Sequence, residues 1–188
     1  MVRAERVISA LVMVLLSTLA LLPTGCTSRT QPAISAEASR PSIGLPVFTD
    51  MVATSLEGAS QITGYRVLGP ATLPEGFHRY GVIDIIKTET ESGNITYRVL
   101  QRWAWDEDQS VLLTLTQDPE LDGIGGGEPT QIGKWPAQRA LTRPIGGEPG
   151  SLNLYWKIQD MAFAIGACLV GPLDEATVTK IAVSLSAN

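Results

Sequence analysis

Cys26 is the residue whose surroundings define its chemistry most closely. It follows a short head with Arg3 and Arg6, an apolar run over Val7–Leu22 and the small residues of "TGC". This order is that of a secretory signal peptide. A cysteine directly after a small residue at the cut is where bacterial lipoproteins receive their lipid. The sequence therefore predicts lipidation of Cys26, and two or more acyl chains there would give stable attachment to a membrane.

The signal has one departure from the usual lipoprotein pattern. Leucine or another aliphatic residue usually stands three positions before the cysteine, where this chain has Pro23, with Leu22 one step further back. The apolar run is about 16 residues long, whereas a helix that spans a bilayer needs roughly 20. An ordinary cleaved signal or an uncleaved anchor is therefore the alternative to lipid attachment.

The second cysteine, Cys168, lies in the apolar run "MAFAIGACLV", which predicts a small buried side chain. A catalytic thiolate needs a cationic neighbour and partial exposure, and the single histidine, His78, is far away in the sequence. If Cys26 carries lipid, no internal disulfide is expected, because the chain has two cysteines. We expect no catalytic residues and no enzymatic activity.

An acidic stretch, "DPELDGIGGGEP", offers a second kind of chemistry. Asp118, Glu120 and Asp122 fall at positions 1, 3 and 5 of a calcium loop of the EF-hand type. Position 12 is Pro129, however, with Glu128 one place too early, and the flanking runs have the pattern of strands. We expect a solvated loop, with weak calcium binding by this loop left open.

Other metal and cofactor chemistry has no support in the sequence. A single histidine and the lack of clustered cysteines and histidines exclude a recognisable zinc site. The triple glycine of the acidic stretch lacks the Lys-Ser/Thr that a phosphate loop needs. Neither a metal nor a cofactor is predicted.

The chain has four tryptophans. Trp103 and Trp105 share one face of an expected strand with Tyr97 and Gln101, while the other face carries arginines. Large aromatic residues of this kind are most often part of a core. If one side of the sheet is left uncovered, Trp103, Trp105 and Trp156 would instead form a face for an apolar ligand or a protein partner.

Strands dominate the expected secondary structure. The runs at 77–90 and 94–106, separated by "ESGN", predict a hairpin, and "SVLLTLTQD" adds a third strand to an antiparallel meander. A weaker strand region, "TQIGKWPAQRALT", is expected to be broken at Pro136. The runs "LNLYWKI" and "MAFAIGACL" predict a second hairpin that turns at Gln159 and Asp160.

Two helices are expected beside these strands. The first is short, with Thr54 or Ser55 as its cap and Gly64 as its stop. The second is C-terminal and begins after Asp174. Its apolar stripe consists of Val178, Ile181, Ala182 and Leu185. The predicted class is α+β: a twisted antiparallel sheet with a short N-terminal helix and a C-terminal helix packed on it.

The chain divides into three parts. Residues 1–25 are the expected lipoprotein signal peptide, 26–46 the lipidated cysteine and a flexible tether rich in Ser, Thr, Ala and Pro, and 47–188 a single α+β domain. Removal of the signal makes the formal net charge of −5 more negative. Such an acidic chain is a poor partner for nucleic acid or anionic headgroups, so the expected link to a membrane is the lipid on Cys26.

Several of these stretches together carry a resemblance. "LGPATLPEGF", "ITYRVL", "VLLTLTQ", "LYWKIQDMAFAIGACL" and "LDEATVTKIAVSL" are similar to a bacterial domain of unknown function. That domain is found on extracytoplasmic lipoproteins and on the outer ends of some membrane-bound anti-sigma factors. The likeness covers most of Leu56 to Leu185. It implies a sheet-and-helix module outside the cytoplasm, with a role in binding or sensing and without established catalytic residues.

These observations predict a membrane-anchored extracytoplasmic lipoprotein in a bacterial cell envelope. Its domain is expected to bind a partner or to monitor conditions at the membrane surface, without catalysis. The alternative is a carrier of a lipid or other amphiphilic ligand, held in a groove on the sheet lined by Trp103 or Trp105.

Overall fold

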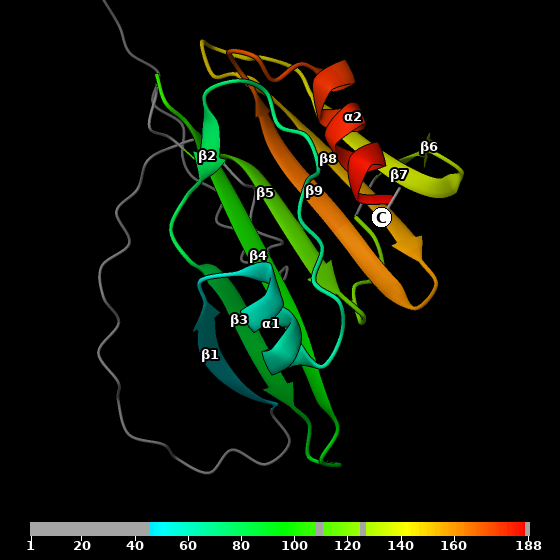
Figure 1. The fold of residues 1–188 in the computed structure, drawn as a ribbon. Helices are drawn as coiled ribbons and strands as arrows, with labels where there is room; N and C mark the ends of the chain where they lie inside the picture. The colour runs from blue at the N-terminus through cyan, green and yellow to red at the C-terminus, as the bar shows by residue number, and fades with distance from the viewer. Residues whose placement is uncertain (1–45, 108–110, 125–126, 187–188) are drawn as a thin grey trace, which may run out of the picture.

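The computed structural model describes residues 46–107, 111–124 and 127–186. The predicted signal segment, Cys26 and all of the tether before Pro46 lie outside these residues. Within the described ranges, nine strands form one antiparallel sheet in the order β1-β3-β4-β5-β9-β8-β7-β6, with β2 paired to β4 beside this path. Both helices lie on the same face of the sheet (Figure 1).

The longest connection between elements within one described range joins α1 to β2. The strands and helices are β1 (Val47–Ala53), α1 (Leu56–Thr63), β2 (Phe77–Arg79), β3 (Ile83–Glu89), β4 (Ile95–Trp105), β5 (Val111–Asp118), β6 (Glu128–Ile132), β7 (Trp135–Thr142), β8 (Gly150–Ile158), β9 (Met161–Leu169) and α2 (Glu175–Ser186).

The predicted meander is present as β3, β4 and β5. Glu89 pairs with Ile95 at the end of the first hairpin, and the backbone N–H of Thr90 donates to the Asn94 carbonyl at 2.9 Å across the turn. The run expected as one strand over 77–90 is two strands. Gly81, with φ at 72°, turns the chain between them, and both β2 and β3 pair with β4.

The break expected at Pro136 is at a different place. Gly133, with φ at 59°, makes the turn between β6 and β7, and Pro136 lies inside β7 opposite Gln131. The pairing of β7 with β8 begins only at Ala137. The missing N–H of Pro136 therefore does not interrupt the ladder between these two strands.

The "LPEGF" stretch forms the turn that leads into β2. The backbone N–H of Phe77 donates to the Pro74 carbonyl at 3.2 Å, and Gly76 has a φ of 78°. A Cβ at Gly76 would lie 3.1 Å from Trp105 Nε1, so a side chain at this position would meet both backbone strain and a crowded indole. The stretch is structural, as its residue types predict.

Each helix begins at the cap that the sequence indicates. Ser55 Oγ accepts a hydrogen bond of 3.0 Å from the Gly58 N–H at the start of α1, and Asp174 Oδ1 accepts one of 2.7 Å from the Thr177 N–H at the start of α2. These caps satisfy donors that the first turn of a helix leaves unpaired. Neither described helix combines the length and hydropathy that are needed to cross a bilayer.

Two apolar cores lie between the helices and the sheet. The smaller core lies under α1 and consists of Ala53, Ala59, Val67, Ile83, Ile85 and Val99. The larger core lies under α2 and includes Leu113, Leu154 and Ile165 of the sheet. The four stripe residues of α2 belong to this larger core and are each no more than 2% exposed, which confirms the predicted packing of the C-terminal helix.

The cap of α2 predicts how the stability of the fold depends on pH. Hydrogen bonds from the Thr177 side chain and backbone lower the pKa of Asp174. A carboxyl whose pKa is lower in the folded state contributes stability above its unfolded pKa and loses it as the pH falls through the folded value. We expect Asp174→Asn, which keeps an acceptor, to flatten the loss of melting temperature below about pH 4. Thermal melts from pH 3 to 7 test this, and an unchanged acid slope would contradict it.

Candidate functional site

A segment between α1 and β2, residues 65–73, crosses the helix-bearing face of the sheet; we call it the strap. Figure 1 shows it leaving α1 and passing in front of the sheet toward β2. Consecutive strap residues join different cores, because Val67 is buried in the core under α1 while Leu68 packs against the core under α2. The strap therefore links the two halves of the sheet.

Two buried glutamines hold the strap. Gln101 of β4 and Gln117 of β5 are each 1% exposed. Gln117 Oε1 accepts from the Leu68 N–H at 3.0 Å, and Gln101 Nε2 donates to the Leu68 carbonyl at 2.7 Å. Gln117 Nε2 also donates to the Arg66 carbonyl at 2.7 Å. The glutamines thus pair strap backbone groups that no neighbouring strand reaches, as buried polar groups require.

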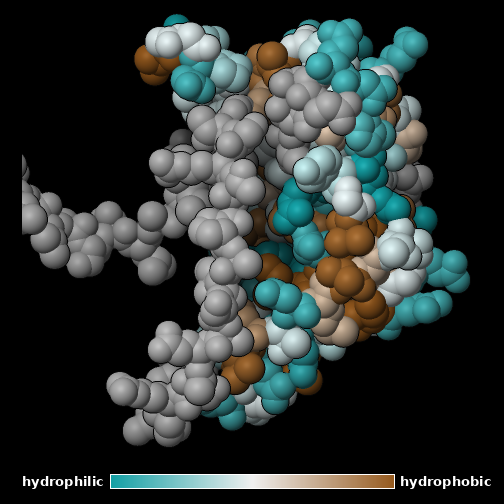
Figure 2. All heavy atoms as spheres, turned by 90° about the vertical axis from the view of Figure 1, so that its left-hand side faces the viewer, coloured by the Kyte–Doolittle hydropathy of each residue, from teal (hydrophilic) through white to brown (hydrophobic). Residues whose placement is uncertain are grey.

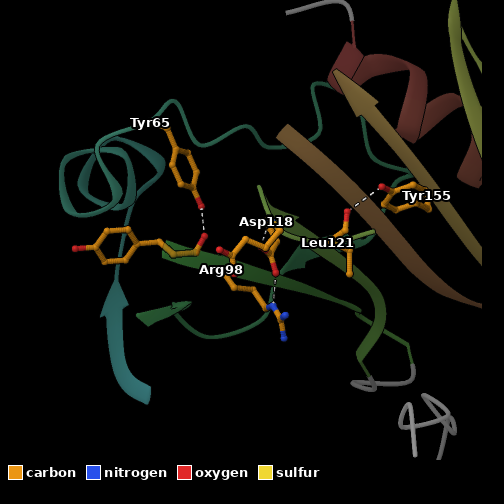
Figure 3. Close-up of polar contacts among 7 residues, drawn as sticks. Tyr65, Arg98, Asp118, Leu121 and Tyr155 are labelled. Atoms are coloured by element: carbon orange, nitrogen blue, oxygen red, sulfur yellow. Dashed lines mark hydrogen bonds and ion pairs between the residues drawn. The ribbon is translucent and has the colours of Figure 1, made fainter. Parts of the chain in front are cut away.

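A tyrosine fixes the first residue of the strap. The Tyr65 hydroxyl donates to the Tyr97 carbonyl of β4 at 2.8 Å (Figure 3). Burial, and then the negative charge of Asp118, raise the pKa of Tyr65 above its ordinary value. The hydroxyl therefore keeps its proton at every physiological pH and remains a donor.

The end of β5 is held by an ion pair and a second tyrosine (Figure 3). Arg98 Nε lies 2.7 Å from Asp118 Oδ2, and the other oxygen of this carboxylate accepts from the Glu120 N–H at 2.8 Å. The Tyr155 hydroxyl of β8 donates to the Leu121 carbonyl at 2.8 Å. The expectation of a solvated loop is wrong for Asp118, which is only 4% exposed.

Three of the four carboxylates considered for calcium face different cations of the protein. Asp118 pairs with Arg98, Asp122 lies 3.0 Å from Lys157, and Glu128 lies 3.4 Å from Arg139, in each case oxygen to nitrogen. Calcium binding would have to replace these separate ion pairs with shared coordination. Among the residues that the structure describes, no group of three or more histidine, cysteine or acidic side chains is placed to hold a metal ion.

A pocket of about 460 Å³ opens beside the start of the strap. It lies where the strap, the end of β5, the β8–β9 turn and the last turn of α2 meet. Its lining residues are Tyr65, Arg66, Leu68, Gln117, Pro119, Ile158, Gln159, Asp160, Met161, Phe163 and Leu185. This volume is within the range of small-molecule sites.

The pocket is apolar inside and polar at its mouth. Leu185 and Phe163 are at most 2% exposed and form part of its interior. Arg66, Gln159 and Asp160 are exposed lining residues. Both ends of the Gln117 amide bond the strap, so this lining amide is already paired. The arrangement suits the burial of an apolar group with a polar end left at the mouth.

The tryptophans lie elsewhere. Trp103 and Trp156 are 4% and 0% exposed and belong to the core under α2, and Trp105 is partly buried against the same core. Trp156 stacks on Phe163 with ring centroids 5.4 Å apart. Phe163 lines the pocket, but none of the three tryptophans predicted as a ligand or partner face does.

Cys168 is 4% exposed, which confirms the prediction that it is buried. The structure has it disulfide-bonded, whereas the sequence predicts no internal disulfide if Cys26 carries lipid. The chain has one other cysteine, Cys26, which lies outside the described residues. A sulfur that carries lipid cannot also form a disulfide, so the two chemistries exclude each other in one molecule.

The edge strand β1 has an apolar surface. Val47, Phe48 and Val52 are between 59% and 65% exposed. Figure 2 faces this side of the molecule and shows hydrophobic patches between hydrophilic ones. An exposed sheet edge with apolar side chains is a surface on which another chain can pair.

Comparison with known proteins gives no match: no family model, no curated protein and no solved structure is similar to this chain. The resemblance described above to the domain of extracytoplasmic lipoproteins therefore stays a prediction.

Proposed function

We propose that this chain is a lipid-anchored extracytoplasmic protein whose domain binds an amphiphilic molecule without catalysis. The observation that carries this proposal is the pocket beside the strap, which combines an apolar interior with a polar mouth. The signal pattern before Cys26 supports the location and the anchor. Among the functions considered from the sequence, the carrier is the one for which this geometry offers a site.

The polar groups near the pocket serve structure. Gln117 and Tyr65 both bond strap or strand backbone. The one histidine, His78, lies 2.7 Å from Asp106 through its Nδ1 on an exposed surface, and neither residue lines the pocket. A reaction would need an acid, a base or a nucleophile that converges on the bound molecule. The interior lining residues provide shape and apolar contact, and the charged lining residues Arg66 and Asp160 are at the exposed mouth.

A second candidate function is the capture of an envelope protein, and β1 favours it. Its outer edge is unpaired within the described sheet, and it exposes Phe48 and Val52 on one face and Val47 on the other. A partner strand could add to this edge through backbone hydrogen bonds. Substitution of Phe48 by Asp would weaken such a complex and leave the pocket unchanged.

The anchor is tested by Cys26→Ser in a bacterial host. We expect a labelled fatty acid to be incorporated into the wild-type chain and not into the variant, because the lipid requires the cysteine sulfur. Release of the variant from the membrane fraction is the second expected result. Intact mass spectrometry of the wild type completes the test. A mass that corresponds to the signal-cleaved chain without lipid, and that increases on reduction, would show a disulfide at the Cys26 sulfur. This result would overturn the lipid anchor.

A further inference from the structure

We propose that the pocket beside the strap holds a single-chain amphiphile with an uncharged head, of the monoacylglycerol type, with its acyl chain inside. This rests on the proposed function of non-catalytic binding and goes further by naming the site and the class of ligand. Four features of the described residues carry it: the size of the pocket, its interior, its mouth and its connection to the strap.

The size of the pocket selects a small ligand. At about 30 Å³ for each water-sized group, the volume of about 460 Å³ holds roughly fifteen non-hydrogen atoms. A monoacylglycerol with an eight-carbon chain is of this size. A phospholipid with two long chains is several times larger and would leave most of its apolar surface in water, which opposes its binding.

The interior selects an unbranched apolar chain. Leu68, Ile158, Met161, Phe163 and Leu185 provide aliphatic, thioether and aromatic surface from the strap, the β8–β9 hairpin and α2. Methionine adapts its shape to flexible apolar ligands more readily than branched side chains do. The amide of Gln117 already makes one hydrogen bond at each end and is 1% exposed, so it offers a ligand little polar contact.

The mouth selects a head without net charge. The exposed lining residues there are one cation, Arg66, one anion, Asp160, and one amide, Gln159. Two opposite charges give neither an anionic nor a cationic head an advantage over water. Hydroxyl groups can donate to the carboxylate or the amide oxygen and accept from the amide NH₂. Gln159, with φ at 55°, makes the tight turn that presents these groups beside the apolar interior.

The pocket shares a residue with the strap, which couples binding to strap order. Gln117 lines the pocket and holds the backbone of Leu68 and Arg66, two strap residues that also line it. A ligand that contacts both the strap and the β8–β9 hairpin binds the protein when the strap lies on the sheet and not when the strap is detached from it. It therefore protects the strap from opening, as any ligand specific for one state stabilises that state.

The experiment uses the full-length chain in isolated bacterial membranes and a photoreactive probe, monooctanoylglycerol with a diazirine in its acyl chain. After irradiation, labelled positions are mapped by peptide mass spectrometry. We expect labels at the strap residues 65–68 and at the hairpin residues 158–163, and competition by unlabelled monooctanoylglycerol. Stronger competition by octanoate or by octyltrimethylammonium than by monooctanoylglycerol would overturn the uncharged head.

Met161→Trp fills the pocket and is the decisive variant. Met161 is partly exposed at the start of β9, where an aromatic residue suits a strand. Leu141→Trp places the same residue on β7, away from the pocket, at a position 42% exposed, and serves as the matched control. We expect about a tenfold loss of label for Met161→Trp and less than about a twofold change for the control.

Two results overturn the site. The first is a Met161→Trp variant that is labelled at the strap and the hairpin as strongly as the wild type, while both variants have the melting temperature of the wild type. The other is label spread evenly over the surface of the wild type. Lipidation of Cys26 is measured on the same membranes by fatty-acid labelling. Intact lipidation without pocket label defeats only this inference, whereas pocket label without lipidation defeats the anchor and leaves the binding site.

Discussion

Truncation of the chain after Gly171 is expected to abolish its cooperative unfolding transition. The deleted segment contains α2, whose Val178, Ile181, Ala182 and Leu185 are each at most 2% exposed in the larger core. Burial of one Val, Ile or Leu side chain contributes about 1.5–3 kcal/mol. Three such residues approach the roughly 5–15 kcal/mol by which a whole domain is stable. Thermal unfolding followed by circular dichroism and by differential scanning calorimetry measures the result.

Single substitutions separate burial from helix formation. Ile181→Ala is expected to destabilise the fold by about 2–5 kcal/mol, because it removes a buried side chain and leaves a cavity. Val183→Ala on the same helix changes a residue that is 37% exposed, and its effect is expected to stay within about 0.5 kcal/mol. Equal effects of the two variants, or a truncated chain that melts like the wild type, would show that α2 does not stabilise the sheet.

The second large effect is expected for Gln117→Ala, at about 2–4 kcal/mol of lost stability. The change leaves the Leu68 N–H and the Arg66 carbonyl without their partners, and an unsatisfied buried group costs about 1–3 kcal/mol. The strap should also be cleaved faster by chymotrypsin after Tyr65 or Leu68, since these bonds become accessible when the strap opens. Chemical denaturation and limited proteolysis measure the two results.

Gln131→Ala is the matched control for the glutamine, because Gln131 is exposed on the edge strand β6. Its stability and its cleavage pattern should equal those of the wild type. Gln101→Ala should resemble Gln117→Ala more weakly, since it removes one strap hydrogen bond instead of two. Wild-type proteolysis of Gln117→Ala would mean that packing of Val67 and Leu68 alone holds the strap.

Local patterns were sufficient to predict much of the fold. The hairpin of β8 and β9 and the packed C-terminal helix follow from residue types with a clear period, such as Leu152, Leu154 and Trp156 on one side of β8. These residues are buried as their alternation indicates. Antiparallel hairpins need only near neighbours in the sequence, so a reading of short stretches finds them.

Pairing between distant segments could not be predicted in this way. β1 has an ordinary mixed sequence, and it is a strand because Ala53 and Met51 pair with Ile83 and Ile85 of β3. Pro136 suggests a break, yet the partner strand begins beyond it. Propensity gives no information about which neighbour a strand has, and the neighbour determines whether a proline is tolerated.

The pocket was missed for a related reason. The number and size of the tryptophans favour a ligand or partner face, but large aromatic residues also fill cores, and Trp103 and Trp156 do so here. The lining residues come from four separate parts of the chain, so no short motif carries them. The sequence does carry a signal for the strap: Gln101 stands between Val99 and Trp103 on an apolar face, and a polar residue there implies a buried partner, which is the Leu68 carbonyl.

The adjacency of β5 and β9 in the middle of the sheet has a consequence for the order of folding. Apart from β1 with β3, every other pair along the main path joins strands that are consecutive or nearly so in the sequence, whereas the junction of β5 and β9 pairs Gln117 with Phe163 and joins the two halves of the sheet. Contacts between distant residues require the closure of a long loop and slow the search for the native state. During synthesis, β1 to β5 and the strap leave the ribosome well before β9, and the strap has no second core to join until this junction forms. We therefore expect a refolding intermediate in which the N-terminal hairpins are protected from hydrogen exchange before the strap is.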